Sequence, residues 1–265
     1  MEPKVIIFGT AVILVMALGI ISFVLVYMRK QQQQQENLNQ LNIIHQRNLL
    51  EASVDSQENV RRQIGGDLHD DIGTLLSATR MQLSLLGKQI KDNEPANDFF
   101  TNTNELLNDA ITNVRRISKE LMPATLDKFG LEIGLKEFAE KFSSVTGVEV
   151  SFLANGIDES LFSKKIALIF FRIVQELVNN SLKHAEASRI NIELSQNERQ
   201  LMLQVADNGK GFDLDEVMAN PKTGIGIRNI ESRLSVINGT VNYDVARGKG
   251  AKINIDVNLA TSILV

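Results

Sequence analysis

The apolar residues between positions 60 and 121 recur at helical spacing in two consecutive stretches, and this pattern limits the possible folds more than any other feature. From about Val60 to Ile90 apolar residues lie three and four positions apart. From Phe99 to Leu121 they repeat about every 3.5 positions, and Pro123 follows. The polar segment 92–97 breaks the pattern. The sequence therefore predicts two long amphipathic helices joined by a short turn.

A hairpin of two such helices cannot cover both of its apolar faces by itself. If each helix buries about seven apolar side chains, the gross gain is on the order of 10 to 20 kcal/mol per helix before entropy is counted. Two copies are expected to pair into a four-helix bundle, so the sequence predicts a homodimer.

The N-terminus carries an uncharged run of about 24 residues from Val5 to Met28, and about 20 are enough to cross a bilayer as a helix. The run is too long for the core of a cleaved signal peptide, so it predicts a single transmembrane helix in contact with membrane lipid. Lys4 precedes the run, and Arg29 with Lys30 follow it, which favours a cytoplasmic location for the C-terminal side.

The composition limits the partners and the compartment of the chain. The net charge of -4 argues against direct binding of nucleic acid, and the absence of cysteine agrees with a reducing compartment without requiring one. Residues 31–59 are rich in Gln, Asn and Glu with an imperfect heptad, which predicts a stalk helix or coiled-coil linker. His45 falls near its seam and is assigned no chemistry.

After Leu131 the pattern becomes mixed, with helical and alternating stretches in turn. Such a mixture predicts an α+β layered domain. The predicted helices are 135–145 and 162–184, and the predicted strands are 148–153, 189–194, 200–207, 239–244 and 251–258.

His69 lies one residue off the first apolar stripe, with Asp70 directly after it. A histidine at the border of a packed seam still faces water, and an exposed imidazole stays partly neutral and nucleophilic near neutral pH. On this helix alone, an ordinary surface histidine and a phosphate acceptor are both consistent with the pattern.

The predicted helix 162–184 carries one polar face, formed by Glu176, Asn180, Lys183 and His184. A carboxylate and an amide one turn apart suit a magnesium-bound nucleotide, because magnesium takes few protein oxygens besides phosphates and water. The alternative is a solvated helix face.

Two glycine pairs follow downstream. Asp207 ends a strand and precedes Gly209 and Gly211, where an acid can accept a hydrogen bond from an exocyclic amine and glycines let backbone approach a ring. Gly224 and Gly226 open a helix, whose free amides suit phosphate. Each pair alone indicates only a turn.

Taken in order over roughly residues 60–257, these segments resemble a two-component sensor histidine kinase. Residues 176–184 resemble the family's N box, residues 207–211 its first glycine box, and residues 224–226 its second. The acceptor helix around His69 and the junction at 121–131 are similar to the subfamily that pairs with response regulators bearing LuxR-type helix-turn-helix outputs.

This resemblance implies a GHKL-type α/β sandwich ATPase domain that uses ATP and Mg²⁺. It further implies autophosphorylation of His69, with Asp70 orienting the ring, and transfer of the phosphoryl group to an aspartate of a cytoplasmic response regulator.

The resemblance also implies roles for residues in the ATP site. Asn180, with Glu176, would hold Mg²⁺ over the phosphates, while Lys183 would neutralise developing charge. Asp207 would read adenine beside Gly209 and Gly211, and Gly224 and Gly226 would hinge a lid. For His184 the alternatives of contacting phosphate and capping the helix remain open.

Two positions depart from the family pattern. Thr74 stands five residues after the histidine, where the subfamily often carries a glutamine. That glutamine positions a water molecule for dephosphorylation of the regulator. Phosphatase activity of this chain therefore depends on whether the threonine hydroxyl can position the water instead. Ala251 stands where threonine often follows the last glycine pair, at residues 248–250, which the pattern alone would assign to a plain hairpin turn.

The interpretation divides the chain into a membrane anchor at 1–30, a stalk at 31–59, a dimerisation and phosphoacceptor domain at 60–122 and an ATP-binding domain at 123–265. Because ATP is intracellular, it predicts a single-pass protein of the bacterial cytoplasmic membrane with both C-terminal domains inside the cell. The alternatives are a catalytically silent scaffold that binds nucleotide and a protein-serine kinase that shares the ATPase fold.

Overall fold

The computed structural model describes residues 3–87, 94–122, 124–220 and 224–262. The chain forms two compact units, Met1–Leu50 and Glu51–Val265. A single helix, α1, covers Pro3–Asp67. Much of the predicted span Val5–Met28 falls on residues whose side chains lie outside the described set. Within the described part of the chain, none of the helices combines the length and the apolar character that a bilayer crossing requires.

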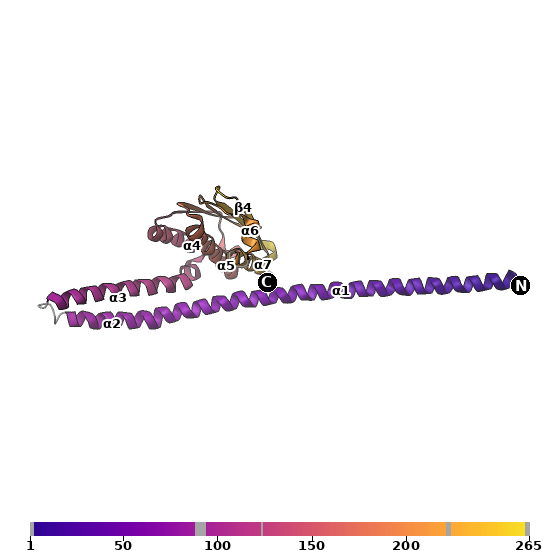
Figure 1. Cartoon of the computed structure of the whole chain (residues 1–265), viewed down its shortest axis with the longest axis horizontal. Coiled ribbons are helices and arrows are strands. Elements are labelled where there is room, and N and C mark those ends of the chain that lie inside the picture. The colour runs from indigo at the N-terminus through magenta and orange to yellow at the C-terminus, as the bar shows by residue number, and fades with distance from the viewer. Residues whose placement is uncertain (1–2, 88–93, 123, 221–223, 263–265) are drawn as a thin grey trace. The chain divides into compact units, whose positions relative to one another are not determined.

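A helical hairpin follows, as the periodicity predicts. The end of α1 continues through the π-helical turn η1 (Leu68–Ile72) into α2 (Gly73–Gly87), and α3 (Glu94–Leu121) returns alongside (Figure 1). The buried Ser118 Oγ donates a hydrogen bond of 2.7 Å to the Gly65 carbonyl. A Cβ on Gly65 would lie 3.2 Å from the Leu121 Cβ, so the two helices approach closely at this point.

The helix boundaries correct the sequence prediction in two places. The first is the break expected at 92–97, whose first two residues lie outside the described part of the chain. Helix α3 starts at Glu94, inside this expected break. Proline at position 95 is compatible with that start, because the first turn of a helix tolerates proline. The helix expected from Val60 onward is interrupted by η1, a widened turn that contains His69. π-turns have no periodicity signature of their own and occur frequently at functional sites.

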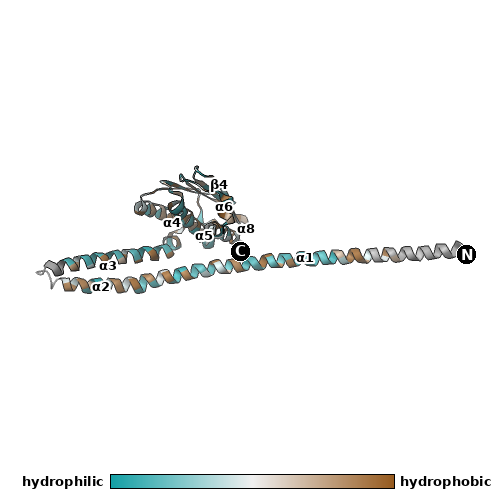
Figure 2. Cartoon of the chain, in the orientation of Figure 1, coloured by the Kyte–Doolittle hydropathy of each residue, from teal (hydrophilic) through white to brown (hydrophobic). Residues whose placement is uncertain are grey.

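Large apolar side chains of the hairpin remain exposed in the single chain. Leu75 is 64% exposed and Leu106 is 71% exposed. Figure 2 shows hydrophobic and hydrophilic residues mixed along the coloured ribbons of α2 and α3. The hairpin therefore has an apolar face that its own two helices leave uncovered.

The remainder of the chain is an α/β domain. Its helices and turns are α4 (Ala124–Thr146, kinked at Gly130), η2 (Glu159–Leu161), α5 (Lys164–Asn180), η3 (Ser181–Ala185), α6 (Leu214–Ala219), α7 (Ile225–Val236) and α8 (Leu259–Ser262). Its strands are β1 (Glu149–Asn155), β2 (Arg189–Gln196), β3 (Gln200–Asp207), β4 (Gly239–Val245) and β5 (Ala251–Asn258). The five predicted strands are confirmed within two residues at each end.

The five strands form one sheet in the order β1-β2-β3-β5-β4, in which only the β1–β2 pair is parallel. The helices α4, α5 and α7 cover one face of it (Figure 1). Alternate residues of β2 and β5 are buried beneath them, as expected for a sheet packed on one side. This is the layered α+β architecture that the sequence predicts.

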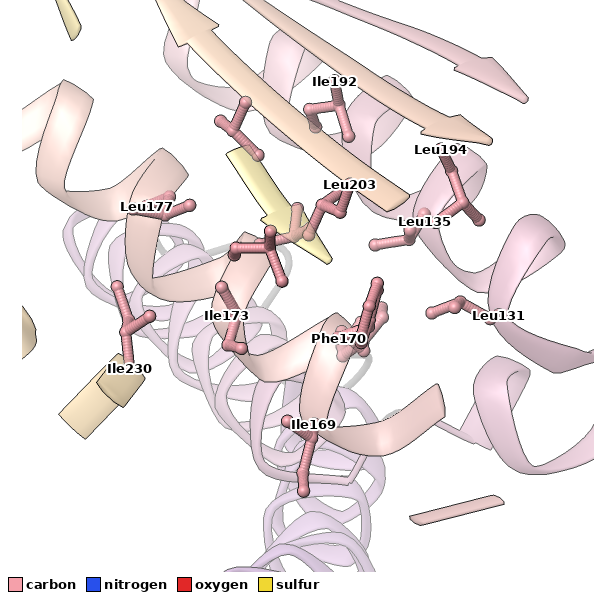
Figure 3. Packing of buried hydrophobic residues seen from close by; sticks show 14 of the residues in the cluster. Leu131, Leu135, Ile169, Phe170, Ile173, Leu177, Ile192, Leu194, Leu203 and Ile230 are labelled. Carbon is pink, nitrogen blue, oxygen red and sulfur yellow. The ribbon is translucent and has the colours of Figure 1, made fainter. Parts of the chain in front are cut away.

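The core lies between these helices and the sheet. Phe170 and Ile173 of α5 are fully buried against Ile192 of β2 and Leu203 of β3, and Leu135 of α4 closes one side (Figure 3). Helix α5 is therefore held by its apolar face, which fixes the direction in which its polar residues point.

A buried ion pair joins α5 to the end of α1. The Arg172 and Glu58 side chains are 2% and 8% exposed, and Arg172 Nε donates to a Glu58 carboxylate oxygen at 3.0 Å. The same guanidinium donates to the carbonyls of Glu120 at 3.0 Å and Leu121 at 2.7 Å. These bonds tie the α/β domain to both helices of the hairpin within the unit Glu51–Val265.

Candidate functional site

His69 lies on η1 with its ring open to solvent. Its Nδ1 is 2.8 Å from Asp70 Oδ1, and the two side chains are 66% and 78% exposed. Because a carboxylate only accepts hydrogen bonds, this contact favours the tautomer with the proton on Nδ1. The other ring nitrogen, Nε2, then keeps its lone pair and can act as a nucleophile.

Thr74 lies at the start of α2, directly after the widened turn, and it is exposed. Its hydroxyl is therefore accessible to water on the same segment that presents His69.

The residues Glu176 and Asn180 lie together near the C-terminal end of α5. The Asn180 Nδ2 is 3.5 Å from the Glu176 Oε1, and both side chains are half-buried. This arrangement places a carboxylate and an amide one turn apart on one face, as the spacing predicts.

Gly226 brings the start of α7 against this pair. A Cβ added to Gly226 would lie 2.6 Å from the Glu176 Oε1 and 3.2 Å from the Asn180 Nδ2. No larger residue fits without moving the carboxylate. The free amides at the beginning of α7 therefore lie beside the oxygen ligands of α5, an arrangement that suits an anionic group bridged by a cation.

Asp207 ends β3 with both carboxylate oxygens occupied by neighbours. Oδ1 accepts a hydrogen bond of 2.9 Å from the Gly209 backbone N–H, and Oδ2 accepts one of 2.8 Å from the Ser181 hydroxyl. These two bonds fix the plane of the carboxylate, and each oxygen retains a lone pair for a further donor such as an exocyclic amine.

The glycines after Asp207 are required by close backbone approach. A Cβ on Gly209 would lie 2.3 Å from the Ala185 carbonyl oxygen, and Gly211, at φ +62°, would collide with the Ala246 carbonyl at 2.0 Å. A Cβ on Gly250, at φ +76°, would lie 2.2 Å from the Asp207 carbonyl oxygen. Residues 248–250 thus form the β4–β5 turn and also pack against the loop that holds Asp207.

Gly224 precedes α7 as its N-cap residue, and a Cβ there would lie 2.7 Å from the Val217 carbonyl. The segment 221–223 before it lies outside the described residues. The expectation of a hinged lid therefore remains a prediction.

Lys183 and His184 do not follow the regular face of α5. Both lie on the π-helical turn η3, which widens the helix after Asn180, and both are exposed. Lys183 borders a cavity together with Asn179 and Leu182, on a different face from Glu176 and Asn180. The structure thus brings together only the first two of the four polar residues that helical spacing assigned to one face.

The donor set fits magnesium delivered with a nucleotide. Among the described residues there is no cluster of three or more His, Cys, Asp or Glu side chains able to cage a cation. A carboxylate and an amide are sufficient for magnesium, because phosphate oxygens and water complete its coordination.

Ser181 belongs to this site although the sequence analysis did not single it out. It is 5% exposed, and it follows Val174 and Leu177 on the buried stripe of α5. The sequence signal that could have identified Ser181 is a hydroxyl at a position where the helical spacing expects an apolar residue. A buried polar group of this kind requires a hydrogen-bond partner. The Ser181 Oγ lies 2.8 Å from Asp207 Oδ2, 26 residues further along the chain, and 3.1 Å from the Leu177 carbonyl oxygen within the helix.

Two family models match the sequence of the chain. A family model described as histidine kinase matches residues 60–126, and one described as histidine kinase-, DNA gyrase B-, and HSP90-like ATPase matches residues 166–261. The first match contains His69, and the second contains the residues around Asp207 and Gly226.

The oxygen sensor histidine kinase NreB of Staphylococcus carnosus (strain TM300) is 30% identical over 240 residues, which are 90% of this chain and 66% of that protein. Among solved structures, the histidine kinase domain of the Erythrobacter litoralis EL346 blue-light activated histidine kinase matches with a TM-score of 0.45 at 19% identity, covering 72% of this chain and 96% of that one. Acinetobacter baumannii histidine kinase AdeS matches with a TM-score of 0.38 at 14% identity, over 58% and 85% of the two chains.

A phosphoacceptor-type helical hairpin followed by a GHKL-type ATPase domain defines the class of sensor histidine kinases. The chain belongs to this family.

Proposed function

We propose that the chain is a protein-histidine kinase that autophosphorylates His69 with ATP. The observation that carries the proposal is the exposed His69–Asp70 pair on the same chain as the converging residues Glu176, Asn180 and Gly226. In the reaction, His69 Nε2 forms a bond to the γ-phosphorus, the bond from phosphorus to the bridging oxygen breaks, and ADP leaves. Asp70 holds the Nδ1 proton and orients the ring.

The ATP site supports this reaction through positioning. Asp207 is placed to accept a hydrogen bond from adenine, while Glu176 and Asn180 would hold Mg²⁺, which supplies charge neutralisation at the phosphates when bound. Gly209 and Gly211 allow the backbone to close around the base, and the residues after Gly224 offer free amides to phosphate. We assign no role to His184, and Lys183 would contribute only if η3 turns it toward the phosphates.

The functional unit is a homodimer. The exposed apolar face of the hairpin, which includes Leu75 and Leu106, supports pairing into a four-helix bundle. The phosphoryl group would pass to an aspartate of a cytoplasmic response regulator with a helix-turn-helix output domain. Thr74 is the candidate for orienting water in the reverse, phosphatase reaction.

The proposed division of the chain is an anchor at 1–30, a stalk at 31–59, the acceptor domain at 60–122 and the ATP-binding domain at 123–265. The uncharged run in the first segment supports single-pass insertion in the bacterial cytoplasmic membrane, with the kinase domains inside the cell.

Incubation of the full chain in lipid nanodiscs with γ-labelled ATP and Mg²⁺ tests the proposal. We expect an acid-labile, base-stable phosphoprotein in the wild type and no label in His69→Gln. His45→Gln is the matched control and should label normally, because His45 belongs to α1 and not to the acceptor turn Leu68–Ile72. Label that persists in His69→Gln would falsify the assignment. Tight ATP binding without any labelled protein would favour the silent scaffold.

A further inference from the structure

A cavity of about 640 Å³ lies apart from the nucleotide site, between α4, α5 and the last turn of α3. This volume is within the range of small-molecule binding pockets, roughly 300 to 1,000 Å³. Neither Glu176 nor Asp207 lines it, and none of the glycines of the two glycine boxes does. The cavity is therefore distinct from the site assigned to ATP.

One side of this cavity is aromatic. Phe138 packs against Phe142 with ring centroids 5.7 Å apart and against the edge of Phe171 at 5.8 Å. Phe171 is buried in the core, whereas Phe138 and Phe142 are half-buried and face the cavity. These rings offer apolar surface and no hydrogen-bonding group, so this side suits a hydrocarbon body better than a polar one.

The charged residues of the lining are mostly cationic, although the whole chain has a net charge of -4. Five cationic side chains line the cavity and only two carboxylates do, those of Glu120 and Glu137. The cationic residues are Arg116, Lys119, Lys128, Lys141 and Lys183.

Both carboxylates already have partners. Glu120 pairs with Arg116 at 2.7 Å, and Glu137 accepts a hydrogen bond from the Thr125 hydroxyl. Over the described parts of the chain, the four lysines at the cavity form no ion pair. Lys141 is half-buried. An anion in the cavity would supply these lysines with a counter-charge.

We propose that this cavity binds a long-chain carboxylate, with its hydrocarbon chain against Phe138 and Phe142 and its carboxylate between Lys128 and Lys141. An inorganic anion would leave the aromatic side unused, and a neutral hydrocarbon would leave the lysines unpaired. An amphipathic anion satisfies both parts of the lining at once.

The site also has a regulatory consequence that rests on the proposed kinase activity. Its walls come from α3 of the hairpin and from α4 and α5 of the ATPase domain. A ligand that contacts all three helices stabilises the arrangement in which they lie together. It shifts the equilibrium between this arrangement and others by the difference in its affinity for them. Occupancy would thus change the autophosphorylation rate without contacting ATP.

Photo-crosslinking tests the binding directly and needs neither ATP nor His69. The full chain in lipid nanodiscs is irradiated with a palmitic acid that carries a diazirine in its chain, and labelled peptides are mapped by mass spectrometry. We expect saturable labelling of α4 and α5 that palmitate competes for and that hexadecanol competes for about tenfold less well, since the alcohol lacks the charge. Labelling confined to α1, or equal competition by hexadecanol, would overturn the proposal.

Two variants on α4 separate the site from non-specific adsorption. Lys128→Gln/Lys141→Gln removes two of the cavity lysines and should lower the saturable labelling about tenfold. Lys136→Gln removes an exposed lysine of the same helix that does not line the cavity, and it should label as the wild type does. Equal labelling of all three proteins would contradict the site. His69→Gln should also label normally, so failure of the kinase assignment and failure of this proposal remain distinguishable.

Discussion

The hairpin and the α/β domain bury their apolar residues in opposite ways. In the α/β domain, Ile173 and Leu203 are at most 1% exposed, because helices and sheet cover each other. In the hairpin, Leu75 and Leu106 are more than 60% exposed. The first region completes its core within one chain, whereas the second presents half of a core and depends on another copy for the rest.

The candidate reactive groups of the two regions also differ in their exposure and in how firmly neighbouring residues hold them. The side chains of His69 and Asp70 are open to solvent, and within the described residues they contact each other and no further polar partner. Asp207, in contrast, is fixed by Ser181 and by the Gly209 amide. A phosphorylated histidine must be reached in turn by a nucleotide and by a partner protein, which requires exposure. A nucleotide site gains from positioning before the ligand arrives, which requires packing.

The largest effect is expected from placing a charge on the uncovered face of the hairpin. Leu106→Asp removes an apolar side chain worth about 1.5–3 kcal/mol from each copy and adds a carboxylate to the interface, so dimerisation should weaken at least about a thousandfold. Sedimentation equilibrium measures the dissociation constant. Thr112→Asp adds the same charge at an exposed position of α3 off the apolar stripe and should leave the dimer intact. Equal weakening by both variants would show that the hairpin does not use this face.

Breaking the ion pair between the two regions is expected to come next. Arg172→Met leaves Glu58 buried without its partner, and such a change costs about 3–5 kcal/mol in the free energy of unfolding. Urea denaturation followed by circular dichroism measures it. The double variant Glu58→Leu/Arg172→Met removes both charges and should recover most of the loss. A double variant as unstable as the single one would contradict the explanation that the unpaired buried carboxylate causes the loss of stability.

A smaller effect is expected at the nucleotide site. Asp207→Asn keeps the shape of the side chain but replaces one acceptor oxygen by a donor, so ATP affinity should fall about 10- to 100-fold, equivalent to about 1.5–3 kcal/mol for a charged hydrogen bond. Equilibrium binding of a fluorescent ATP analogue measures the dissociation constant. Asp244→Asn, at an exposed position of β4, is the control and should bind normally. Unchanged affinity in Asp207→Asn would remove this carboxylate from the site.

A more local effect is expected at the start of α5, the helix that carries Glu176 and Asn180. The Ser163 hydroxyl accepts a hydrogen bond from the Ile166 amide and caps this helix. Ser163→Ala should lower the free energy of unfolding by about 1 kcal/mol with little change in ATP affinity. Urea denaturation and nucleotide binding test the two parts separately. A large loss of ATP binding at unchanged stability would contradict a purely capping role.

The smallest effect is expected at Asp158, on the surface beside η2. Hydrogen bonds from the Ser160 hydroxyl and then from the Ser160 amide lower the pKa of this carboxyl. A lowered folded-state pKa stabilises the fold above the unfolded-state pKa, and this contribution is lost as the pH falls through the folded-state pKa. Thermal midpoints of Asp158→Asn and the wild type should therefore differ near neutral pH and converge in acid. A constant difference at all pH values would contradict the ionic origin.

Most secondary structure could be predicted from sequence because each element carries a clear period. The strand 251–258 alternates strictly, the strand 200–207 buries every second residue from Leu201 to Val205, and the helix that contains Glu176 has a continuous apolar stripe. Neither π-turn could be predicted in this way, since one extra residue per turn leaves no period of its own. The widened turns lie at His69 and just after Asn180, so they decide the orientation of groups that a regular helix would place differently.

By itself, the sequence determined the order of the elements, the His-Asp pair and the glycine positions, because these depend on residue type and short spacing. Only the tertiary structure decided that Gly226 closes on Glu176, that Ser181 orients Asp207, and that Lys183 turns toward a second cavity. It also joined Arg172 to Glu58, 114 residues earlier in the chain. Such pairings depend on how helices and sheet pack, and packing brings together residues whose separation in sequence carries no signal.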